Sequence, residues 1–191
     1  MKKCLLIVDM QNDFSEEGAL PVAGFSELIQ GINKKIEEYK NKEQLVVLTK
    51  DWHPENHISF VGSTWDQSLQ TELWPKHCVQ DSFGAMVDKR IQLNKVDYIV
   101  HKGDDQMIDS YSVFQDANKN WNDEIKRILK REQVEELEIV GVAGEFCVKY
   151  TAIDAIELGY KVFANQQLTK YIDQSKKEAI LKEFDEKQIK Y

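Results

Sequence analysis

Five short apolar runs, separated by longer amphipathic stretches, are the feature of this sequence that most constrains its fold. The runs cover residues 4–9, 45–50, 98–101, 137–143 and 161–164. Each is nearly continuous in apolar residues, which is typical of strands buried on both faces of a parallel sheet. Their alternation with helices predicts a three-layer α/β/α fold with right-handed crossovers and a central, mostly parallel sheet. We expect five strands, or six if residues 188–191 add another.

Three of the intervening stretches carry apolar residues at helical spacing. The apolar positions are 28, 32 and 36 in the first stretch, 121, 125, 128 and 129 in the second, and 148, 152, 155 and 156 in the third. Gly159 follows the third stretch, and a glycine just past the last turn commonly ends a helix. We therefore predict three amphipathic helices that pack on the sheet.

Length and composition exclude several classes of protein. The chain of 191 residues fits a single domain, 1–191. Its 25 Lys and Arg against 33 Asp and Glu give a net charge of −8, which argues against a nucleic-acid partner because phosphate binding requires a basic surface. Three cysteines, an odd and sparse set, indicate a reducing compartment. The first apolar run is too short for a secretion signal or a membrane span, so we expect a cytoplasmic protein with no membrane partner.

Ionisable or nucleophilic residues stand where four of the apolar runs stop, and in open α/β sheets ligands bind beyond these strand ends. They are Asp9, Asp51, Lys102 and Cys147. Each alone would be ordinary, but together they favour a catalytic site. Cys147 opens a predicted helix, where unpaired N–H groups favour a thiolate, and a nearby Lys102 would lower the thiol pKa further. The alternative is a cysteine that only packs, as Cys4 is expected to do inside its strand.

A second group of residues has the composition of a metal site. Asp51 and His53 alternate at a strand end, so their side chains share one face, and His77 could return from the following loop as a third ligand. Three protein ligands with open positions for water are typical of a catalytic metal. The alternative is a surface loop that happens to contain histidines and aromatics. His101 precedes Lys102 in a strand and should point to the opposite face, so we expect a structural role for it.

Five motifs along the chain resemble, in the same order, those of the nicotinamidase branch of the isochorismatase-like cysteine hydrolases. They are VDMQNDF at 8–14, DWHP at 51–54, WPKHCV at 74–79, VHKG at 100–103 with DSYS at 109–112, and GVA at 141–143 leading to Cys147. The resemblance extends from about residue 3 to about residue 164. It implies a parallel sheet flanked by helices, in agreement with the apolar pattern.

The resemblance also implies roles for individual residues. Its catalytic triad falls on Asp9, Lys102 and Cys147. Its oxyanion hole would consist of the backbone N–H groups of Ala143 and Cys147, with a cis peptide bond before Ala143. Its metal ligands fall on Asp51, His53 and His77. His57 would be either an extra ligand or a neighbour of the ligands. The contacts to the substrate ring fall on Phe14, Trp65 and Tyr111. Such a donor set accepts one divalent ion, with zinc expected first and iron or manganese as alternatives.

The implied activity is the metal-dependent hydrolysis of nicotinamide to nicotinate and ammonia through a thioester at Cys147, in the salvage of pyridine nucleotides. The partner would be this small molecule, and the family often assembles into homo-oligomers. The alternatives are a related cysteine hydrolase that acts on another carboxamide or ureido compound, and a homologue with impaired catalysis. Two residues support impaired catalysis: Glu145 stands where the family usually has Asp, and Asp81 stands where the family often has Gly. Asp81 would need a positive φ, which Asp tolerates better than most residues, and Asn165 replaces the family's Asp after the fifth strand.

Overall fold

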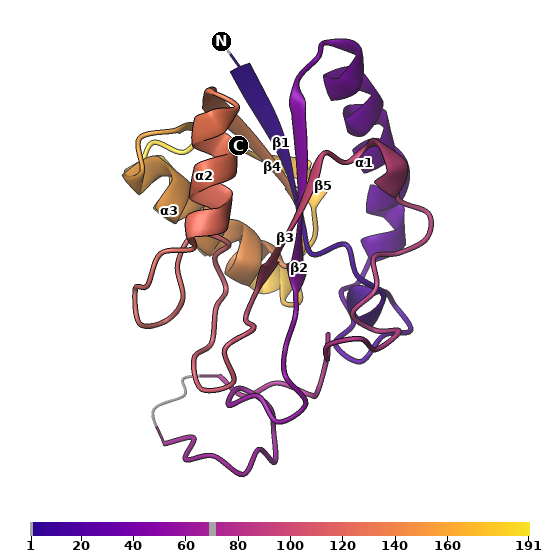
Figure 1. Ribbon diagram of the computed structural model, residues 1–191, viewed down its shortest axis with the longest axis vertical. Helices are drawn as coiled ribbons and strands as arrows, with labels where there is room; N and C mark the ends of the chain where they lie inside the picture. Colours follow the sequence, from indigo (N-terminus) through magenta and orange to yellow (C-terminus); the bar gives the residue numbers. More distant parts are fainter. Residues whose placement is uncertain (1, 69–71) are drawn as a thin grey trace.

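A five-stranded, all-parallel sheet forms the centre of the computed structural model, which describes residues 2–68 and 72–191 (Figure 1). The strands are β1 (Lys2–Val8), β2 (Leu45–Asp51), β3 (Tyr98–Lys102), β4 (Val134–Gly141) and β5 (Lys161–Thr169). Their order across the sheet is β3-β2-β1-β4-β5. The order therefore reverses between β1 and β4, and at such a switch point the carboxyl ends of the strands open a crevice for a ligand.

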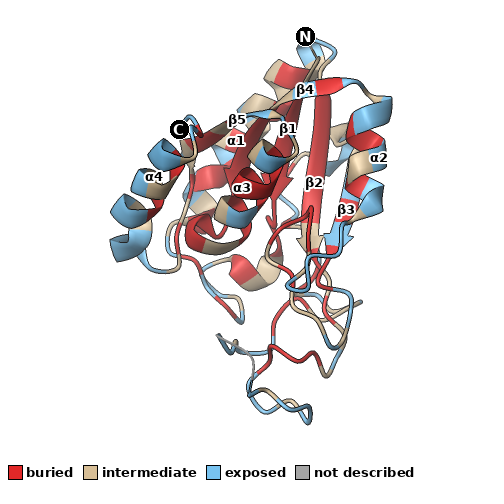
Figure 2. Cartoon of the chain, turned by 90° about the vertical axis from the view of Figure 1, so that its left-hand side faces the viewer, coloured by how far each residue is buried: buried red, intermediate tan, exposed pale blue. Residues whose placement is uncertain are grey.

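Helices cover both faces of the sheet and complete the three layers. The helices are α1 (Phe25–Asn41), α2 (Asp123–Arg131), α3 (Lys149–Glu157) and α4 (Lys177–Glu186), with the short turns η1 (Asn12–Phe14), η2 (Leu93–Lys95), η3 (Gly144–Val148) and η4 (Gln174–Lys176). The side chains of β1 alternate between the layers: Leu5 and Ile7 pack with α1, whereas Leu6 and Val8 pack in the core that includes α2, α3 and α4. Both faces of the central strands are therefore buried, whereas the edge strand β3 is partly exposed, as Figure 2 shows.

The predicted fold class and the three predicted helices are confirmed. Gly159 lies just past α3 with a φ of +88°, a left-handed conformation that suits a helix end. The second helix begins later than position 121, because Asn122 caps it by accepting a hydrogen bond from the N–H of Glu124 at 3.0 Å. Trp121 consequently lies outside the helix and is 40% exposed. None of the helices in the described part of the chain is both long enough and apolar enough to span a membrane.

The carboxyl-terminal part of the sheet differs from the prediction. β5 continues to Thr169, past the predicted end at residue 164. The polar residues there are buried with partners, since the amide of Asn165 donates to the carboxylate of Glu138 at 2.8 Å. Residues 188–191 do not form a sixth strand, because only a single bridge joins Lys190 to Phe163. The helix α4 precedes this bridge. Its sequence is rich in Lys and Glu and has only two buried apolar residues, Ile180 and Phe184, so no apolar pattern predicted it.

Candidate active site

Three of the residues predicted at the strand ends meet around one sulfur atom. Asp9 follows β1, Lys102 ends β3, and Cys147 lies in η3 after β4. The Nζ atom of Lys102 lies 2.9 Å from Oδ2 of Asp9 and 3.2 Å from Sγ of Cys147. The hydroxyl of Thr49, on β2, donates to the other Asp9 oxygen at 2.6 Å. The topology of the sheet thus brings a carboxylate, a cation and a thiol into one buried cluster.

Burial sets the protonation of this cluster. It raises the pKa of the Cys147 thiol well above its usual value, and the nearby Lys102 cation only partly opposes this. The predicted lowering of this pKa is therefore wrong, because the helix start is buried rather than open to water. Burial also raises the pKa of Asp9. Burial alone would lower the pKa of Lys102, but the carboxylates of Asp51 and Asp9 outweigh it and keep this side chain charged.

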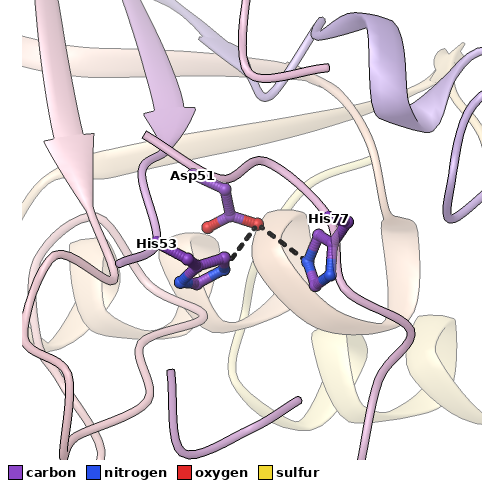
Figure 3. A group of neighbouring side chains, drawn as sticks. All are labelled: Asp51, His53 and His77. Atoms are coloured by element: carbon purple, nitrogen blue, oxygen red, sulfur yellow. Dashed lines mark ion pairs between the residues drawn. The ribbon is translucent and has the colours of Figure 1, made fainter. Parts of the chain in front are cut away.

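The residues proposed from spacing as metal ligands also converge (Figure 3). Ligand atoms of Asp51, His53 and His77 all lie within 4.8 Å of one another. The Nε2 atoms of both histidines are 3.8 Å from Oδ2 of Asp51. Each ring holds its Nδ1 atom 2.8 Å from a backbone carbonyl, that of Gly103 for His53 and that of Pro75 for His77. Because a carbonyl only accepts, Nδ1 carries the hydrogen in each ring, so Nε2 is the atom that would bind a cation. At His53 a cation would compete with a proton for this atom, because Asp51 raises the pKa of His53 against the effect of burial.

Two features fit this cluster to a divalent cation. Burial lowers the pKa of His77 to about 4, so its ring is neutral at neutral pH, as a metal ligand must be. A Cβ atom on Gly103, whose φ is +68°, would lie 2.5 Å from the ring of His53. Only glycine therefore lets this ring lie against the backbone. Asp51 joins the two clusters, because its other carboxylate oxygen accepts a hydrogen bond from Lys102.

The two remaining histidines lie outside the ligand cluster. Both ring nitrogens of His57 are engaged, Nδ1 with the hydroxyl of Ser59 at 2.7 Å and Nε2 with the carbonyl of Ile108 at 3.3 Å. Its ring packs beside that of His53, with centroids 4.3 Å apart. The placement makes His57 a neighbour of the ligands. His101 is exposed and stacks on Trp52 at 4.7 Å, in agreement with the structural role expected for it.

A narrow pocket of about 370 Å³, including space open to solvent, lies in front of Cys147. Phe14 and Tyr111, two of the three predicted ring contacts, line it together with Asp51, His53 and His77. Trp65 is not part of the lining, and this prediction is corrected: its ring is 41% exposed, and its indole N–H donates to the carbonyl of Asn56 on the surface. Trp74 and Phe146, to which the sequence assigned no individual role, also line the pocket.

The backbone before Cys147 has two features that bear on the oxyanion hole implied by the resemblance. The peptide bond between Val142 and Ala143 is cis, as predicted. The N–H group of Ala143 donates to no group in the described residues, although Ala143 is buried and lines the pocket. A buried N–H group without a protein partner is rare and is available to a ligand.

Two polar residues outside the predicted set hold this site together. Gln11 is fully buried, and its side-chain amide bonds both backbone groups of Asp51, each at 2.8 Å. Asp13 accepts a hydrogen bond from the N–H of Cys78 at 2.7 Å, next to His77. Their place in the motif at 8–14 was the only signal in the sequence. Asp81 has a φ of +61°, the positive value expected where the family has glycine.

Comparisons with known proteins show which family and which solved structures this chain is similar to. A family model of the isochorismatase domain matches residues 3–189. The nicotinamidase of Escherichia coli is 34% identical over 168 residues, which are 84% of this chain and 79% of the relative. A solved structure from L. infantum, in complex with nicotinate, has a TM-score of 0.90 at 33% identity and covers 99% of this chain and 91% of its own. The pyrazinamidase of Pyrococcus horikoshii, in complex with zinc, has a TM-score of 0.83 at 34% identity, with 100% and 98% covered.

Proposed function

Because this chain belongs to the isochorismatase domain family, we propose that it is a nicotinamidase, which hydrolyses nicotinamide to nicotinate and ammonia. The observation that carries the proposal is the approach of Lys102 to both Asp9 and Cys147, at the floor of a pocket with aromatic walls. Such a pocket fits a flat ring, and the buried thiol beneath it is placed to attack a carboxamide. Among the similar solved structures, one contains nicotinate.

The residues of the chain support the following roles. Asp9, whose pKa is raised by burial, accepts the proton of the Cys147 thiol, while Lys102 stabilises the thiolate. The thiolate attacks the carboxamide carbon, and the N–H groups of Ala143 and Cys147 stabilise the oxyanion that forms. Asp9 returns the proton to the leaving nitrogen, and ammonia departs. Water then cleaves the thioester, which frees nicotinate and restores the thiol.

The same site supports a divalent metal held by Asp51, His53 and His77. We propose zinc, with iron and manganese as alternatives that the donor set also accepts. When bound, the ion would supply Lewis acidity at the pocket that these three residues line. A cytoplasmic location and assembly into homo-oligomers stay predictions, and the three free, buried cysteines are compatible with the former.

Ammonia release from nicotinamide tests the proposed function. We expect the metal-loaded protein to release one ammonia for each nicotinate formed, and a chelator to reduce the rate. Cys147→Ala should lower kcat to background, because the covalent step is lost. Cys4→Ala, which alters a buried thiol far from the pocket, is the matched control and should stay active. If no ammonia appears with zinc, iron or manganese, or if Cys147→Ala retains activity, the proposal is wrong.

A further inference from the structure

The turn that carries the nucleophile is bonded to a segment that follows β5. The N–H of Gly144 donates to the carbonyl of Lys170 at 2.8 Å. The carboxylate of Glu145 accepts hydrogen bonds from the N–H groups of Ile172 at 3.2 Å and Asp173 at 2.7 Å. Glu145 lies two residues before Cys147, whereas its partners lie 27 and 28 residues further along the chain. One side chain therefore ties two distant parts of the chain together beside the reacting sulfur.

Glu145 lies behind the pocket rather than in it. Its side chain is buried, with 3% of the residue exposed, and it does not belong to the lining. Its neighbours Ala143, Phe146 and Cys147 do line the pocket, as does Ile172 on the opposite segment. A buried carboxylate is costly unless it is well hydrogen-bonded, and bonds to a charged acceptor are about twice as strong as neutral ones. This arrangement therefore fixes Ile172 relative to Cys147.

The two walls of the pocket are held in different ways. Aromatic residues on one wall support each other: the indole of Trp74 donates to the Tyr111 hydroxyl at 3.1 Å, and the rings of Trp74 and Phe146 meet edge to face at 4.9 Å. Ile172 lies in residues 170–173, which belong to neither a strand nor a helix. The position of this second wall depends on the bonds made by Glu145 and Gly144, together with the N–H of Lys170, which donates to the carbonyl of Gly141 at 3.3 Å, and with the buried side chain of Tyr171.

We infer that Glu145 is a positioning residue that holds the Ile172 wall close to Cys147 and so restricts the pocket to carboxamides of a single six-membered ring. This inference rests on the proposed function. Loss of the carboxylate would free the N–H groups of Ile172 and Asp173 and let these two residues move outward, and fused-ring carboxamides would then fit. The bond between Gly144 and Lys170 would remain, so the fold should be retained.

The relative rate on a large and a small substrate tests the inference. The measured quantity is kcat/KM for quinoline-3-carboxamide divided by kcat/KM for nicotinamide. Glu145→Gln keeps the size of the side chain but replaces one accepting oxygen with an NH₂ group. That group cannot accept a hydrogen bond from the backbone N–H opposite it, so one hydrogen bond is lost. We expect this variant to raise this ratio about tenfold, as for the loss of one hydrogen bond to a charged group. Glu145→Asp keeps the charge on a shorter side chain and should give an intermediate ratio.

A second buried glutamate provides the matched control. Glu138 is 6% exposed and accepts hydrogen bonds from Tyr39 at 2.9 Å and Asn165 at 2.8 Å, away from the pocket. Glu138→Gln should lower stability and leave the substrate ratio unchanged. Ile172→Ala, which removes the wall itself, should raise the ratio as Glu145→Gln does, and the double variant should add little further. A merely structural role of Glu145 would lower stability without changing the ratio.

Alkylation of Cys147 tests this inference independently of the proposed function, because the reaction does not require nicotinamide to be a substrate. We would compare the rates of iodoacetamide and of its larger N-naphthyl derivative, followed by mass spectrometry of the modified thiol. Glu145→Gln should accelerate the larger reagent relative to the smaller one, whether or not nicotinamide is a substrate. An unchanged ratio of alkylation rates in Glu145→Gln, or in Glu145→Asp if the first variant does not fold, would overturn the inference.

Discussion

At the scale of single residues, Lys102 combines a proposed catalytic role with a structural one. Its cation lies between the carboxylates of Asp9 and Asp51 in a buried site. Lys102→Met would leave both carboxylates without a partner, and removing one member of a buried ion pair typically costs about 3–5 kcal/mol. We therefore expect this variant to lose stability by that amount, as measured by urea unfolding, in addition to losing activity.

Lys50 provides the control for this substitution. It lies one residue before Asp51 but is partly exposed, and its Nζ atom lies 3.9 Å from the centroid of the Trp52 ring. Lys50→Met should cost about 1 kcal/mol or less, the usual value of an exposed cation–π contact. Equal losses in the two variants would show that the carboxylates around Lys102 are neutral rather than charged.

The residues of the site differ in how far the sequence could predict them. The convergence of Asp51 with His53 followed from their spacing at a strand end, and both lie in the cluster with His77. The resemblance implies a ring contact for Trp65 rather than for Trp74, whereas Trp74 lines the pocket and Trp65 does not; both belong to the irregular part of the chain after β2. The path of such a segment depends on tertiary hydrogen bonds, which leave no periodic pattern in a sequence.

At the scale of elements, the end of β4 has no room for a side chain. Gly141 has a φ of +115°, and a Cβ atom there would lie 2.1 Å from the carbonyl oxygen of Val8 in β1. Because this neighbour is backbone, it cannot move without displacing the strand. Gly141→Ala should therefore destabilise the protein by more than 3 kcal/mol, beyond the roughly 1–2 kcal/mol of a left-handed residue alone.

Substitution of Gly159 distinguishes the effect of a positive φ from the effect of the close contact with Val8. Gly159 also has a positive φ, of +88°, but a Cβ atom there would meet nothing within 4 Å. Gly159→Ala should cost only about 1–2 kcal/mol in the same unfolding experiment. If the two alanine variants were equally stable, close contact between β4 and β1 would not be the constraint.

The elements themselves were largely predictable, because buried strands and amphipathic helices leave clear patterns. The prediction failed where a polar sequence is buried by pairing. β5 carries Asn165 and Thr169 inside the fold, where hydrogen bonds rather than apolar side chains satisfy them. The helix α4 buries only Ile180 and Phe184 among charged residues, too few to give a distinct periodicity.

At the scale of the whole molecule, a bound metal should stabilise the fold through linkage. An ion that binds only the folded state adds about 2.7 kcal/mol at a concentration of 100 Kd. For a chain of 191 residues, this corresponds to a rise in Tm of roughly 5–10 °C. We expect zinc to raise the Tm and a chelator to reverse the shift, as measured by calorimetry.

Two histidine variants make this measurement specific. His77→Ala removes one proposed ligand and should abolish most of the shift. His101→Ala removes an exposed ring that stacks on Trp52, outside the ligand cluster, and should leave the shift intact. A zinc shift of equal size in both variants would place the ion elsewhere.

The bridge between Lys190 and Phe163 has a consequence for how the protein behaves in concentrated solution. β5 is an edge strand, and edge strands with free backbone groups promote aggregation by pairing with other molecules. Lys190 occupies this edge, since its carbonyl accepts from the N–H of Ala164 at 2.7 Å and its N–H donates to the carbonyl of Val162 at 3.3 Å. Ile189, which is buried, anchors it there. These few residues therefore protect the β5 edge of the sheet from self-association without adding a full strand.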